Sequence, residues 1–570
     1  MAVEPTLRIR WLGRVPYREA HVLQGALHRG VADHLLMLEH PDVLTLGVRG
    51  DMSHVLFDHV AAGVDVVRTD RGGDVTYHGP GQLVVYPILS VPMGTAAIPR
   101  YVRIVEQVVI DTLADLGLVA GRLDGFPGVW VGAGTPSVRK LCAVGVRVAR
   151  GRTMHGLALN VDPDLSWFTR IVPCGIEDKA VTSLAAEGID VSMAEVVDAL
   201  AARAVAHWAE GRPVERQGVV SGAGWRPDDR SMIASGAPRG ARTRIRLRQA
   251  GTDPDAGIAL QSRKPPWLRV PTTMGDEFLE LRRTVRGLGL VTVCEEAGCP
   301  NIFECWADGT ATFMINGERC TRACGFCQVD TRRPLALDPG EPARVARAVD
   351  RLGLAHAVVT AVARDDLADG GAAAFAATIA AIRHVRPATS VEVLISDCRG
   401  VASSLQTIFD ARPDVLNHNL ETVARLQRAV RPSASYARSL AVLAQASSAG
   451  LTTKSGLMVG LGESDAEVIG ALADLRAVGV DIVTLGQYLR PTAAHLPVAR
   501  WVAPEQFDQL RLAGEAMGFA HVQASPLTRS SYHAREAASS AARGGAVPAG
   551  LPASPRAAAP QDNPAALARP

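Results

Sequence analysis

One short segment of the chain holds three cysteines in a C-x3-C-x2-C pattern: Cys320-Thr321-Arg322-Ala323-Cys324-Gly325-Phe326-Cys327. A second triplet lies upstream in a C-x4-C-x5-C pattern, made by Cys294, Cys299 and Cys305. Four thiolates usually hold a 4Fe–4S cluster, so each triplet leaves one iron without a protein thiolate. An iron left open in this way is free to bind a small molecule. The sequence therefore predicts two 4Fe–4S clusters with an open coordination position each.

The aromatic residue just before the last cysteine makes the first triplet more specific. A C-x3-C-x-aromatic-C loop is the arrangement that presents S-adenosylmethionine to an open iron, so this molecule is expected as a second cofactor. Two alternatives stay open at this point, a zinc site and a set of disulfides. Zinc sites usually pair two short-spaced cysteine hairpins, whereas these triplets are staggered. The N-terminal residues contain no apolar stretch typical of an export signal, so we expect a reducing cytoplasmic location, which disfavours disulfides.

The composition indicates a multidomain globular protein. A chain of 570 residues is too long for one ordinary core, so two or more domains are expected. The net charge of +2 gives no electrostatic argument for binding nucleic acid or an anionic membrane, and neither partner is expected. Arginine carries nearly all of the positive charge, because the chain has only four lysines: Lys140, Lys179, Lys264 and Lys454.

Patterns along the chain divide it into four parts. Residues 1–215 alternate short β-rich runs with two helical stretches, one of which starts at the capping box Ser192-x-x-Glu195, so an α+β domain is expected. Residues 216–262 are rich in Gly, Ser, Asp and Arg without a sustained period, which predicts a flexible linker between two independently working domains. Residues 536–570 are rich in Ala, Pro and Gly and are expected to be a disordered tail.

Residues 263–535 form the second expected domain. Downstream of the cysteines, β-rich runs alternate with helical patterns, including one that starts at the capping box Ser464-x-x-Glu467. Repeated βα units imply a parallel sheet, curved or closed as a barrel, with the active site at the carboxyl ends of its strands. The expected strands are His356–Val362, Val391–Ile395, Asp414–Asn419, Thr452–Val459, Asp481–Gln487 and His521–Gln523.

The second domain resembles lipoyl synthase, a radical S-adenosylmethionine enzyme with a partial TIM barrel. The resemblance covers residues 263–534 and rests on both cysteine triplets together with several further motifs. Those motifs are Lys264-Pro265-Pro266-Trp267-Leu268-Arg269, Arg364-Asp365-Asp366, Asp369-Gly370-Gly371, Asn417-His418-Asn419-Leu420-Glu421-Thr422, Gly460-Leu461-Gly462-Glu463, Gln487-Tyr488-Leu489-Arg490-Pro491 and Arg529-Ser530-Ser531-Tyr532.

The resemblance implies a role for each cysteine triplet. Cys320, Cys324 and Cys327 would hold the cluster that binds and cleaves S-adenosylmethionine. Cys294, Cys299 and Cys305 would hold an auxiliary cluster that is consumed as the sulfur donor, with Ser531 as its additional ligand. A serine oxygen is a harder and weaker ligand than a thiolate, which suits an iron that must be released. The residues expected to contact S-adenosylmethionine are Asp365, Asp366, Gly370, Gly371, Asn417 and Glu421.

The first domain has a candidate nucleophile, Cys174, in a turn-like setting between Pro173 and Gly175. A free thiol is mostly protonated at neutral pH, so a base is needed, and the candidates are Lys140, His78 and His155. The domain also has a glycine-rich loop at residues 71–82. No GK[ST] sequence follows this loop, so nucleotide binding is only weakly indicated.

These segments, with residues 153–160, resemble octanoyl-acyl carrier protein:protein N-octanoyltransferase, which has a biotin/lipoate protein ligase-like fold. The resemblance covers residues 7–210 and implies that Cys174 accepts octanoate as a thioester while Lys140 acts as its base. It also implies that three parts of the chain bind the octanoyl group: residues 71–78, 143–145 and 155–157. Their residues are Arg71, Gly72, Gly73, Asp74, Val75, Thr76, Tyr77, His78, Ala143, Val144, Gly145, His155, Gly156 and Leu157.

Together the two resemblances imply a bifunctional enzyme of lipoyl cofactor synthesis. The first domain would transfer octanoate to a lysine of a carrier domain, and the second would insert sulfur at C6 and C8 of that chain. The implied partners are octanoyl-acyl carrier protein, the lipoyl domains of 2-oxoacid dehydrogenases, the glycine cleavage H protein and an electron donor. The alternatives are an ATP-using lipoate–protein ligase, a methylthiotransferase, and a scaffold or iron–sulfur carrier without catalytic activity.

Overall fold

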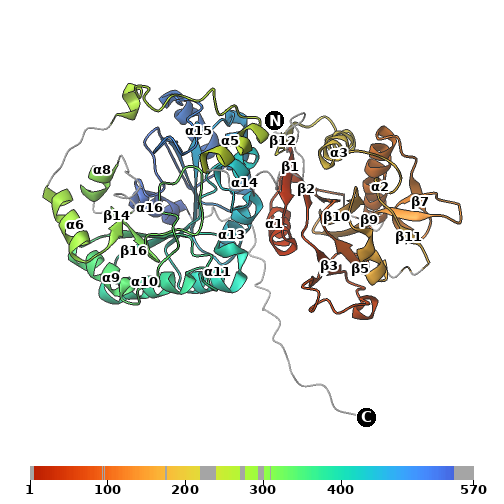
Figure 1. Ribbon diagram of the computed structural model, residues 1–570, viewed down its shortest axis with the longest axis horizontal. Helices are drawn as coiled ribbons and strands as arrows, with labels where there is room; N and C mark the ends of the chain where they lie inside the picture. Colours follow the sequence, from red (N-terminus) through yellow and green to blue (C-terminus); the bar gives the residue numbers. More distant parts are fainter. Residues whose placement is uncertain are drawn as a thin grey trace, which may run out of the picture.

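The computed structural model describes residues 6–92, 94, 97–173, 176, 178–218, 239–269, 276–292, 301–307 and 310–544. These residues form two lobes, shown in Figure 1. Among them, no helix is both long enough and apolar enough to span a bilayer. Three of the residues predicted to carry chemistry, Cys174, Cys294 and Cys299, lie outside the described residues.

The N-terminal lobe is built on a nine-stranded mixed sheet in the order β12-β1-β2-β6-β10-β9-β8-β7, with β11 beside β9. A small sheet in the order β4-β3-β5 carries the glycine-rich segment on β5. The strands are β1 Leu7–Arg14, β2 Asp33–Glu39, β3 Val43–Leu46, β4 Asp65–Arg68, β5 Val75–His78, β6 Gln82–Ile88, β7 Gly121–Leu123, β8 Phe126–Val131, β9 Arg139–Ala149, β10 Arg152–Asn160, β11 Ala180–Val181 and β12 Val214–Gln217.

Helices cover both faces of the larger sheet, and the alternation of side chains along each strand decides which face each residue meets. On β2, Leu35 and Met37 join the core formed with α2 (Ala97–Asp115) and α3 (Met193–Trp208). Leu36 and Leu38 point the other way, into the core that contains α1 (Tyr17–Arg29). The predicted capping box of α3 is present, with Ser192 and Glu195 bonding to each other's backbone amides.

The C-terminal lobe is an eight-stranded sheet whose order, β13-β14-β15-β16-β17-β18-β19-β20, follows the chain. Every pairing from β14 to β20 is parallel, and only β13 runs antiparallel to its neighbour, which confirms the expected partial barrel. The strands are β13 Val291–Thr292, β14 Thr310–Ile315, β15 His356–Ala361, β16 Ser390–Leu394, β17 Val415–Asn417, β18 Thr453–Val459, β19 Ile482–Gln487 and β20 His521–Ala524.

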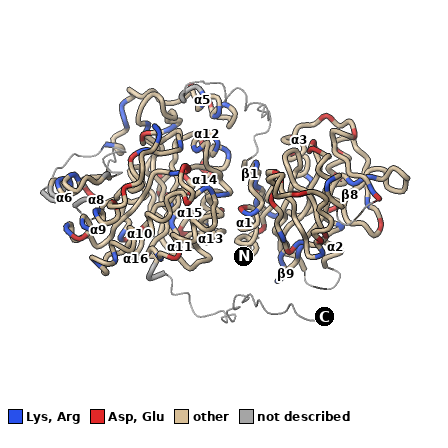
Figure 2. The backbone as a smooth tube through the Cα atoms, turned by 60° about the horizontal axis from the view of Figure 1, so that its bottom comes forward, with Lys and Arg blue, Asp and Glu red and all other residues tan. Residues whose placement is uncertain are grey.

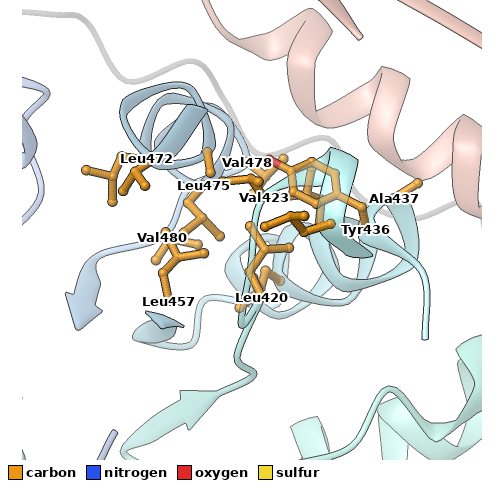
Figure 3. Close-up of a cluster of buried hydrophobic side chains, with 14 of the residues drawn as sticks. Leu420, Val423, Tyr436, Ala437, Leu457, Leu472, Leu475, Val478 and Val480 are labelled. Atoms are coloured by element: carbon orange, nitrogen blue, oxygen red, sulfur yellow. The ribbon is translucent and has the colours of Figure 1, made fainter. Parts of the chain in front are cut away.

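Helices alternate with these strands and cover the outside of the barrel. The longer helices of this lobe are α6 Asp276–Gly287, α9 Glu341–Arg351, α10 Ala372–Val385, α11 Ala402–Asp410, α13 Tyr436–Ser448, α14 Asp465–Ala477, α15 Pro504–Ala516 and α16 Ala534–Gly544. Figure 3 shows part of the apolar layer between strand and helices, where Leu457 of β18, Leu475 of α14 and Tyr436 of α13 belong to one cluster of buried side chains. The predicted capping box of α14, Ser464 with Glu467, is also present.

The second half of the expected linker is structured and belongs to the barrel lobe. Helix α5 (Arg239–Gln249) occupies it, with Leu247 buried in the same core as α13 and α14. Beyond the helix, Arg425 donates to the Ala250 carbonyl, and Ile258 forms a β-bridge with Val498. Residues 219–238 lie outside the described residues. The expected tail also begins later than residue 536, because α16 continues to Gly544.

The described residues of the two lobes share a buried interface, so the lobes are docked as well as tethered, while their independent activity stays a prediction. Helix α1 lies against α13, as the views of Figure 1 and Figure 2 both show, and its Ala20, Leu23 and Leu27 belong to a core that continues into the barrel lobe. At the centre of this interface, Arg10 of β1 donates to both carboxylate oxygens of Asp474 on α14, at 2.8 and 2.9 Å.

The Arg10–Asp474 pair is almost fully buried, and both side chains make further hydrogen bonds. The Asp474 carboxylate also accepts from the Tyr436 hydroxyl at 2.8 Å, and Arg10 donates to Glu215 of β12 at 2.9 Å. A buried charge that loses its partner costs about 3–5 kcal/mol, because the remaining charge stays out of water. The pair therefore fixes the position of one lobe on the other.

We expect the two lobes to remain associated when the chain is cut between residues 219 and 238. The co-expressed halves should co-elute at equal stoichiometry in size-exclusion chromatography, since each half keeps all of its own residues at the interface. Asp474→Ala should weaken this association by about 100-fold or more, because it leaves the buried Arg10 guanidinium without the Asp474 carboxylate. Asp508→Ala, at an exposed position of α15, is the matched control and should change nothing. Halves that separate without the Asp474 substitution would contradict the prediction.

Candidate active sites of the two domains

A cavity in the N-terminal domain gathers most of the residues expected to bind the octanoyl group. The glycine-rich loop, the middle of β9 and the middle of β10 line it together, although 86 positions in the chain separate Arg71 of the loop from Leu157 of β10. The predicted residues on its wall are Arg71, Gly72, Gly73, Thr76, His78, Ala143, Val144, Gly145, His155, Gly156 and Leu157. Its further lining residues, which the sequence analysis missed, are Tyr17, Val84, Tyr86 and Ala158.

Three of the predicted residues do not line the cavity. Asp74 is turned toward the loop after β3, where it accepts from His54 at 2.5 Å. Tyr77 stacks on Trp167 and donates to Asp42 at 2.7 Å. Val75 is buried in the small core with Leu44 and Leu46. Their neighbours on the loop alternate with them, so the strand geometry of β5 turns Thr76 and His78 to the cavity instead.

Arg71 holds the glycine-rich loop in place. Its buried guanidinium donates to the carbonyls of Thr45 at 2.6 Å and Asp74 at 2.7 Å, which ties the loop to β3. The loop also lies directly on β9, because the Gly72 amide donates to the Val146 carbonyl at 3.1 Å. A Cβ at Gly145 would come within 2.9 Å of the Gly72 carbonyl oxygen, so only glycine permits this contact.

The two histidines of the cavity are held as neutral rings. Burial lowers the pKa of His78 to about 3, and its Nδ1 lies 2.7 Å from Gln82. Burial also lowers the pKa of His155 to about 4, although its Nε2 lies 2.7 Å from Asp70. Neither ring takes up a proton readily at neutral pH, which disfavours both as the general base.

Lys140 lies on β9, buried, with its ammonium group 4.7 Å from the centre of the Trp130 ring. Cys142, two positions along the strand, is fully buried, and burial raises its pKa to about 12. A thiol in that state is a packing residue rather than a nucleophile. The predicted nucleophile Cys174 lies outside the described residues, so its distance to Lys140 stays a prediction.

The C-x3-C-x2-C loop of the second domain is supported from three sides. The Cys320 amide donates to Asp330, the Gly325 amide donates to Val430 at 2.8 Å, and the Leu496 amide donates to Gly325 at 3.0 Å. His495 contacts the Cys327 carbonyl through Nε2 at 3.0 Å. The loop follows β14, so it lies at the carboxyl ends of the parallel strands, where barrel active sites are built.

The three thiols of this loop suit a cationic cluster. Burial raises the pKa of Cys324 to about 12, and the neighbouring Cys327 and Cys320 sulfurs add to the shift. The Cys324 thiol resists ionisation in the bare protein, and it becomes a favourable ligand when a metal supplies the opposing charge. The residues present therefore fit a 4Fe–4S cluster, held by Cys320, Cys324 and Cys327.

The acidic residues expected to contact S-adenosylmethionine are engaged by arginines. Asp365 receives two hydrogen bonds from Arg322, each 2.8 Å, and Asp366 receives two from Arg364, each 2.9 Å. Gly370 and Gly371 both adopt left-handed backbone conformations. Their close approaches are to Cys398 and Asn316, so their glycine character is explained by packing of the turn.

Asn417 is fully buried, and Glu421 is partly buried. Asn417 donates to Glu392 at 2.9 Å, and Glu392 is paired in turn with Lys454 at 3.0 Å. Burial raises the pKa of Glu421, although Arg431 opposes the shift. Both Arg431 and Glu421 are close enough to Cys324 to influence its ionisation, which places them beside the cysteine loop. Asp397, Arg431 and His495 around this loop were not predicted.

The described part of the auxiliary site brings the expected segments together. Cys305 on α8 (Ile302–Ala307) and Tyr532, next to Ser531, line one cavity with Glu304. The Tyr532 hydroxyl donates to Glu304 at 3.1 Å, which holds the Arg529–Tyr532 motif against α8. Cys294 and Cys299 lie outside the described residues, so the complete ligand set stays a prediction.

Comparison with known proteins accounts for both domains. Family models match three parts of the chain: the lipoyl protein ligase A/B catalytic domain at residues 16–204, the N-terminal domain of lipoyl synthase at 255–299, and the radical SAM superfamily at 314–475. The lipoyl synthase of Mycobacterium avium (strain 104) is 53% identical over 308 residues, which cover 54% of this chain and 98% of that protein. The chain belongs to the lipoyl synthase family.

A second relative agrees: the lipoyl synthase of Rubrobacter xylanophilus is 56% identical over 283 residues, covering 49% of this chain and 88% of that protein. Among solved structures, a bi-partite lipoate protein ligase from Thermoplasma acidophilum is 20% identical with a TM-score of 0.32, over 38% of this chain and 86% of that chain.

The matches confirm both family resemblances. The protein is an enzyme that combines a lipoyl ligase/transferase-type domain with a radical SAM lipoyl synthase domain, and its cofactors are 4Fe–4S clusters and S-adenosylmethionine.

The buried neutral histidines predict acid sensitivity of the N-terminal domain. Burial lowers the pKa of His40 to about 4, and its Nδ1 donates to the Val15 carbonyl at 2.6 Å. A histidine in the unfolded chain has a pKa near 6.5, so below about pH 6.5 the unfolded state binds protons that the native state does not bind. The free energy of unfolding should therefore fall by up to about 1.4 kcal/mol per pH unit for each such ring, from about pH 6.5 down to its native pKa.

Thermal melts of the full chain between pH 7.5 and pH 5 measure this effect. His40→Asn keeps a donor for Val15 but cannot be protonated, so the fall in melting temperature should become shallower. His384→Gln, at an exposed position of α10, is the control and should leave the profile unchanged. An unchanged slope in His40→Asn would contradict the assignment of His40 to the acid loss.

Proposed function

We propose that the chain is a bifunctional enzyme of protein-bound lipoyl cofactor synthesis. The first domain transfers octanoate from octanoyl-acyl carrier protein to a lysine of a lipoyl domain through a thioester on Cys174. The second inserts two sulfur atoms, at C6 and C8 of that octanoyl chain. The observation that supports the proposal best is the presence, in one chain, of a complete cysteine loop for the radical chemistry and a cavity for the acyl group, lined in part by β9, the strand that carries Lys140.

The first half-reaction forms one bond and breaks one bond at the acyl carbon. The Cys174 thiolate attacks the carbonyl carbon of the octanoyl thioester, and the carrier's sulfur leaves. In the second half-reaction the lysine amine of the lipoyl domain attacks the new thioester, forms the amide and releases the Cys174 thiolate. Val84, Val144 and Leu157 give the cavity an apolar wall that suits the octanoyl chain.

Lys140 is the proposed proton acceptor for Cys174 and later for the incoming amine. Its position under the Trp130 ring, at the edge of a largely buried site, limits its access to water. The rival candidates His78 and His155 are neutral rings already engaged with Gln82 and Asp70. The lysine side chain can act as a base in proteins, whereas an arginine stays charged.

In the second domain the bound cofactors supply the radical and the sulfur, and the protein supplies ligands and orientation. Cys320, Cys324 and Cys327 would hold the cluster that receives S-adenosylmethionine, with Glu421 beside them and Asp365 fixed by Arg322. Cys294, Cys299, Cys305 and Ser531 would hold the auxiliary cluster. The reaction needs an electron donor and a reducing compartment, so we place it in the cytoplasm.

The proposed carriers are the lipoyl domains of 2-oxoacid dehydrogenases and the glycine cleavage H protein. The direct test supplies octanoyl-acyl carrier protein, S-adenosylmethionine, a reductant and an apo lipoyl domain, without ATP, and follows the mass of the lipoyl domain. An octanoyl adduct followed by replacement of two hydrogens by two sulfurs is expected. A requirement for ATP and free octanoate would instead indicate ligase activity.

Cys174→Ala should abolish octanoyl transfer, because no acceptor for the thioester remains. Lys140→Arg keeps the charge but cannot accept a proton, so its transfer rate should fall by about 10²–10⁴-fold. The measurement is the rate of lipoyl-domain acylation, with hydroxylamine lability of the trapped adduct mapped to Cys174. Lys179→Arg is the matched control and should keep the parent rate. Full activity in Cys174→Ala would rule out the thioester route.

Anaerobic reconstitution should load about eight irons per chain, four for each cluster. Cys324→Ala should remove about half of the iron and the response to S-adenosylmethionine, whereas Cys305→Ala should remove the other half and keep that response. Iron analysis and electron paramagnetic resonance spectra measure both. Cys398→Ala, at a buried thiol outside both triplets, is the control. A parent protein that binds about four irons, or zinc, contradicts the assignment.

A further inference from the structure

A chain of paired charges runs from the N-terminal domain to the cysteine loop of the second domain. Glu19 on α1 accepts from Arg438 Nε on α13 at 2.6 Å. Arg438 Nη1 lies 3.6 Å from Oδ2 of Asp397, after β16. The other oxygen of Asp397 accepts from Arg322 at 2.5 Å, and Arg322 also donates to Asp365. Arg322 stands inside the loop, between Cys320 and Cys324.

The members of this chain are shielded from water. Asp397 is fully buried, Arg322 is 6% exposed, and Glu19 and Arg438 are 10% and 19% exposed at their side chains. Charges in such surroundings interact more strongly than charges on the surface, since water does not screen them. The fit around Glu19 is also close: a Cβ on Gly400, which has φ of 75°, would meet its Oε1 at 2.7 Å.

Arg322 connects this chain of charges to the ligands. Its backbone amide donates to the Cys320 sulfur at 3.4 Å, and its guanidinium donates to Asp365, whose own backbone amide donates to the Thr321 hydroxyl. The direction of the Arg322 side chain therefore affects the position of Asp365, beside the sulfur that the Arg322 backbone contacts. Asp397 sets that direction, because it holds one end of the guanidinium.

Glu19 affects which of the two arginines, Arg438 or Arg322, binds Asp397 directly. It holds Arg438 by a short hydrogen bond, which keeps that guanidinium at 3.6 Å from Asp397 rather than in direct contact. Without the Glu19 charge, Arg438 is free to bind Asp397 directly and to compete with Arg322. Two residues before Glu19, Tyr17 lines the acyl cavity, so the same first turn of α1 serves both domains.

We propose that Glu19 of the N-terminal domain is a positioning residue for the cluster loop of the lipoyl synthase domain, acting through Arg438, Asp397 and Arg322. The inference rests on the proposed assignment of Cys320, Cys324 and Cys327 to the cluster that binds S-adenosylmethionine. It makes the docked N-terminal domain a structural part of the radical site.

The test uses the full chain, reconstituted anaerobically, with S-adenosylmethionine as the probe. Glu19→Gln should keep the parent iron content and octanoyl transfer within about twofold, since Glu19 does not line the acyl cavity. Its dissociation constant for S-adenosylmethionine should rise by about tenfold, equivalent to about 1.4 kcal/mol. The electron paramagnetic resonance spectrum of the reduced cluster with S-adenosylmethionine should broaden or shift, a readout that a purely structural role would not move.

Glu215→Gln is the matched control. Glu215 lies at the same interface and pairs with Arg10 at 2.9 Å, but it has no route to the cysteine loop. Its variant should leave both the spectrum and the affinity unchanged. Glu19→Asp keeps the charge on a shorter side chain, so it should recover part of the lost affinity and covers the case in which Glu19→Gln folds poorly.

A charge swap separates positioning from docking. Glu19→Arg combined with Arg438→Glu restores the interdomain pair but places a carboxylate beside Asp397, so S-adenosylmethionine affinity should remain about tenfold or more below the parent. Parent affinity in the swap, or a parent spectrum in Glu19→Gln, would overturn the proposal. A parent protein with no cluster that responds to S-adenosylmethionine would overturn the ligand assignment itself, and the inference with it.

Discussion

The structure depends on helix α1 meeting two partners at once. One side of the helix packs on the N-terminal sheet beside the acyl cavity, and the other packs on α13 of the barrel. Charged side chains buried at this interface need partners, and the pairs of Arg10 on β1 with Asp474 and of Glu19 on α1 with Arg438 provide them. A buried ion pair contributes little net stability. It does destabilise every other arrangement of the two domains, since each of those would leave a buried charge without its partner. The interface therefore specifies one relative position of the domains.

Local signals in the sequence predicted the elements whose causes are local. Both capping boxes formed where expected, because three residues contain the whole interaction. The parallel order of the barrel strands followed from the alternation of strand and helix along the chain. Helix α1 was not predicted, because it buries Glu19 and Gln24 as well as apolar residues, and no residue near it in sequence reveals the domain that covers them.

Contacts between residues that are distant in the chain also limited the prediction of the site residues. Most of the residues that line the acyl cavity were found through their motifs, and the fold brings three segments that are distant in the chain together. Asp365 and Asp366 lie in the turn where the motif predicts them, but their arginine partners could not be inferred. Arg322 reaches Asp365 across 43 positions and Asp397 across 75, and such contacts exist only after the barrel has closed around the loop.

The position of the interface also bears on how one enzyme serves two sites. The N-terminal domain docks on α13 and α14, which lie on the outside of the barrel, whereas the cysteine loop lies at the carboxyl ends of its strands. Docking therefore leaves the end of the barrel that carries the chemistry uncovered by α1. In the proposed function the octanoyl chain is attached to a carrier protein and cannot pass through the protein as a free molecule, so the carrier would have to move from one site to the other. A fixed pair of domains shortens that movement without a tunnel, and it raises the local concentration of acylated carrier near the second site through proximity alone.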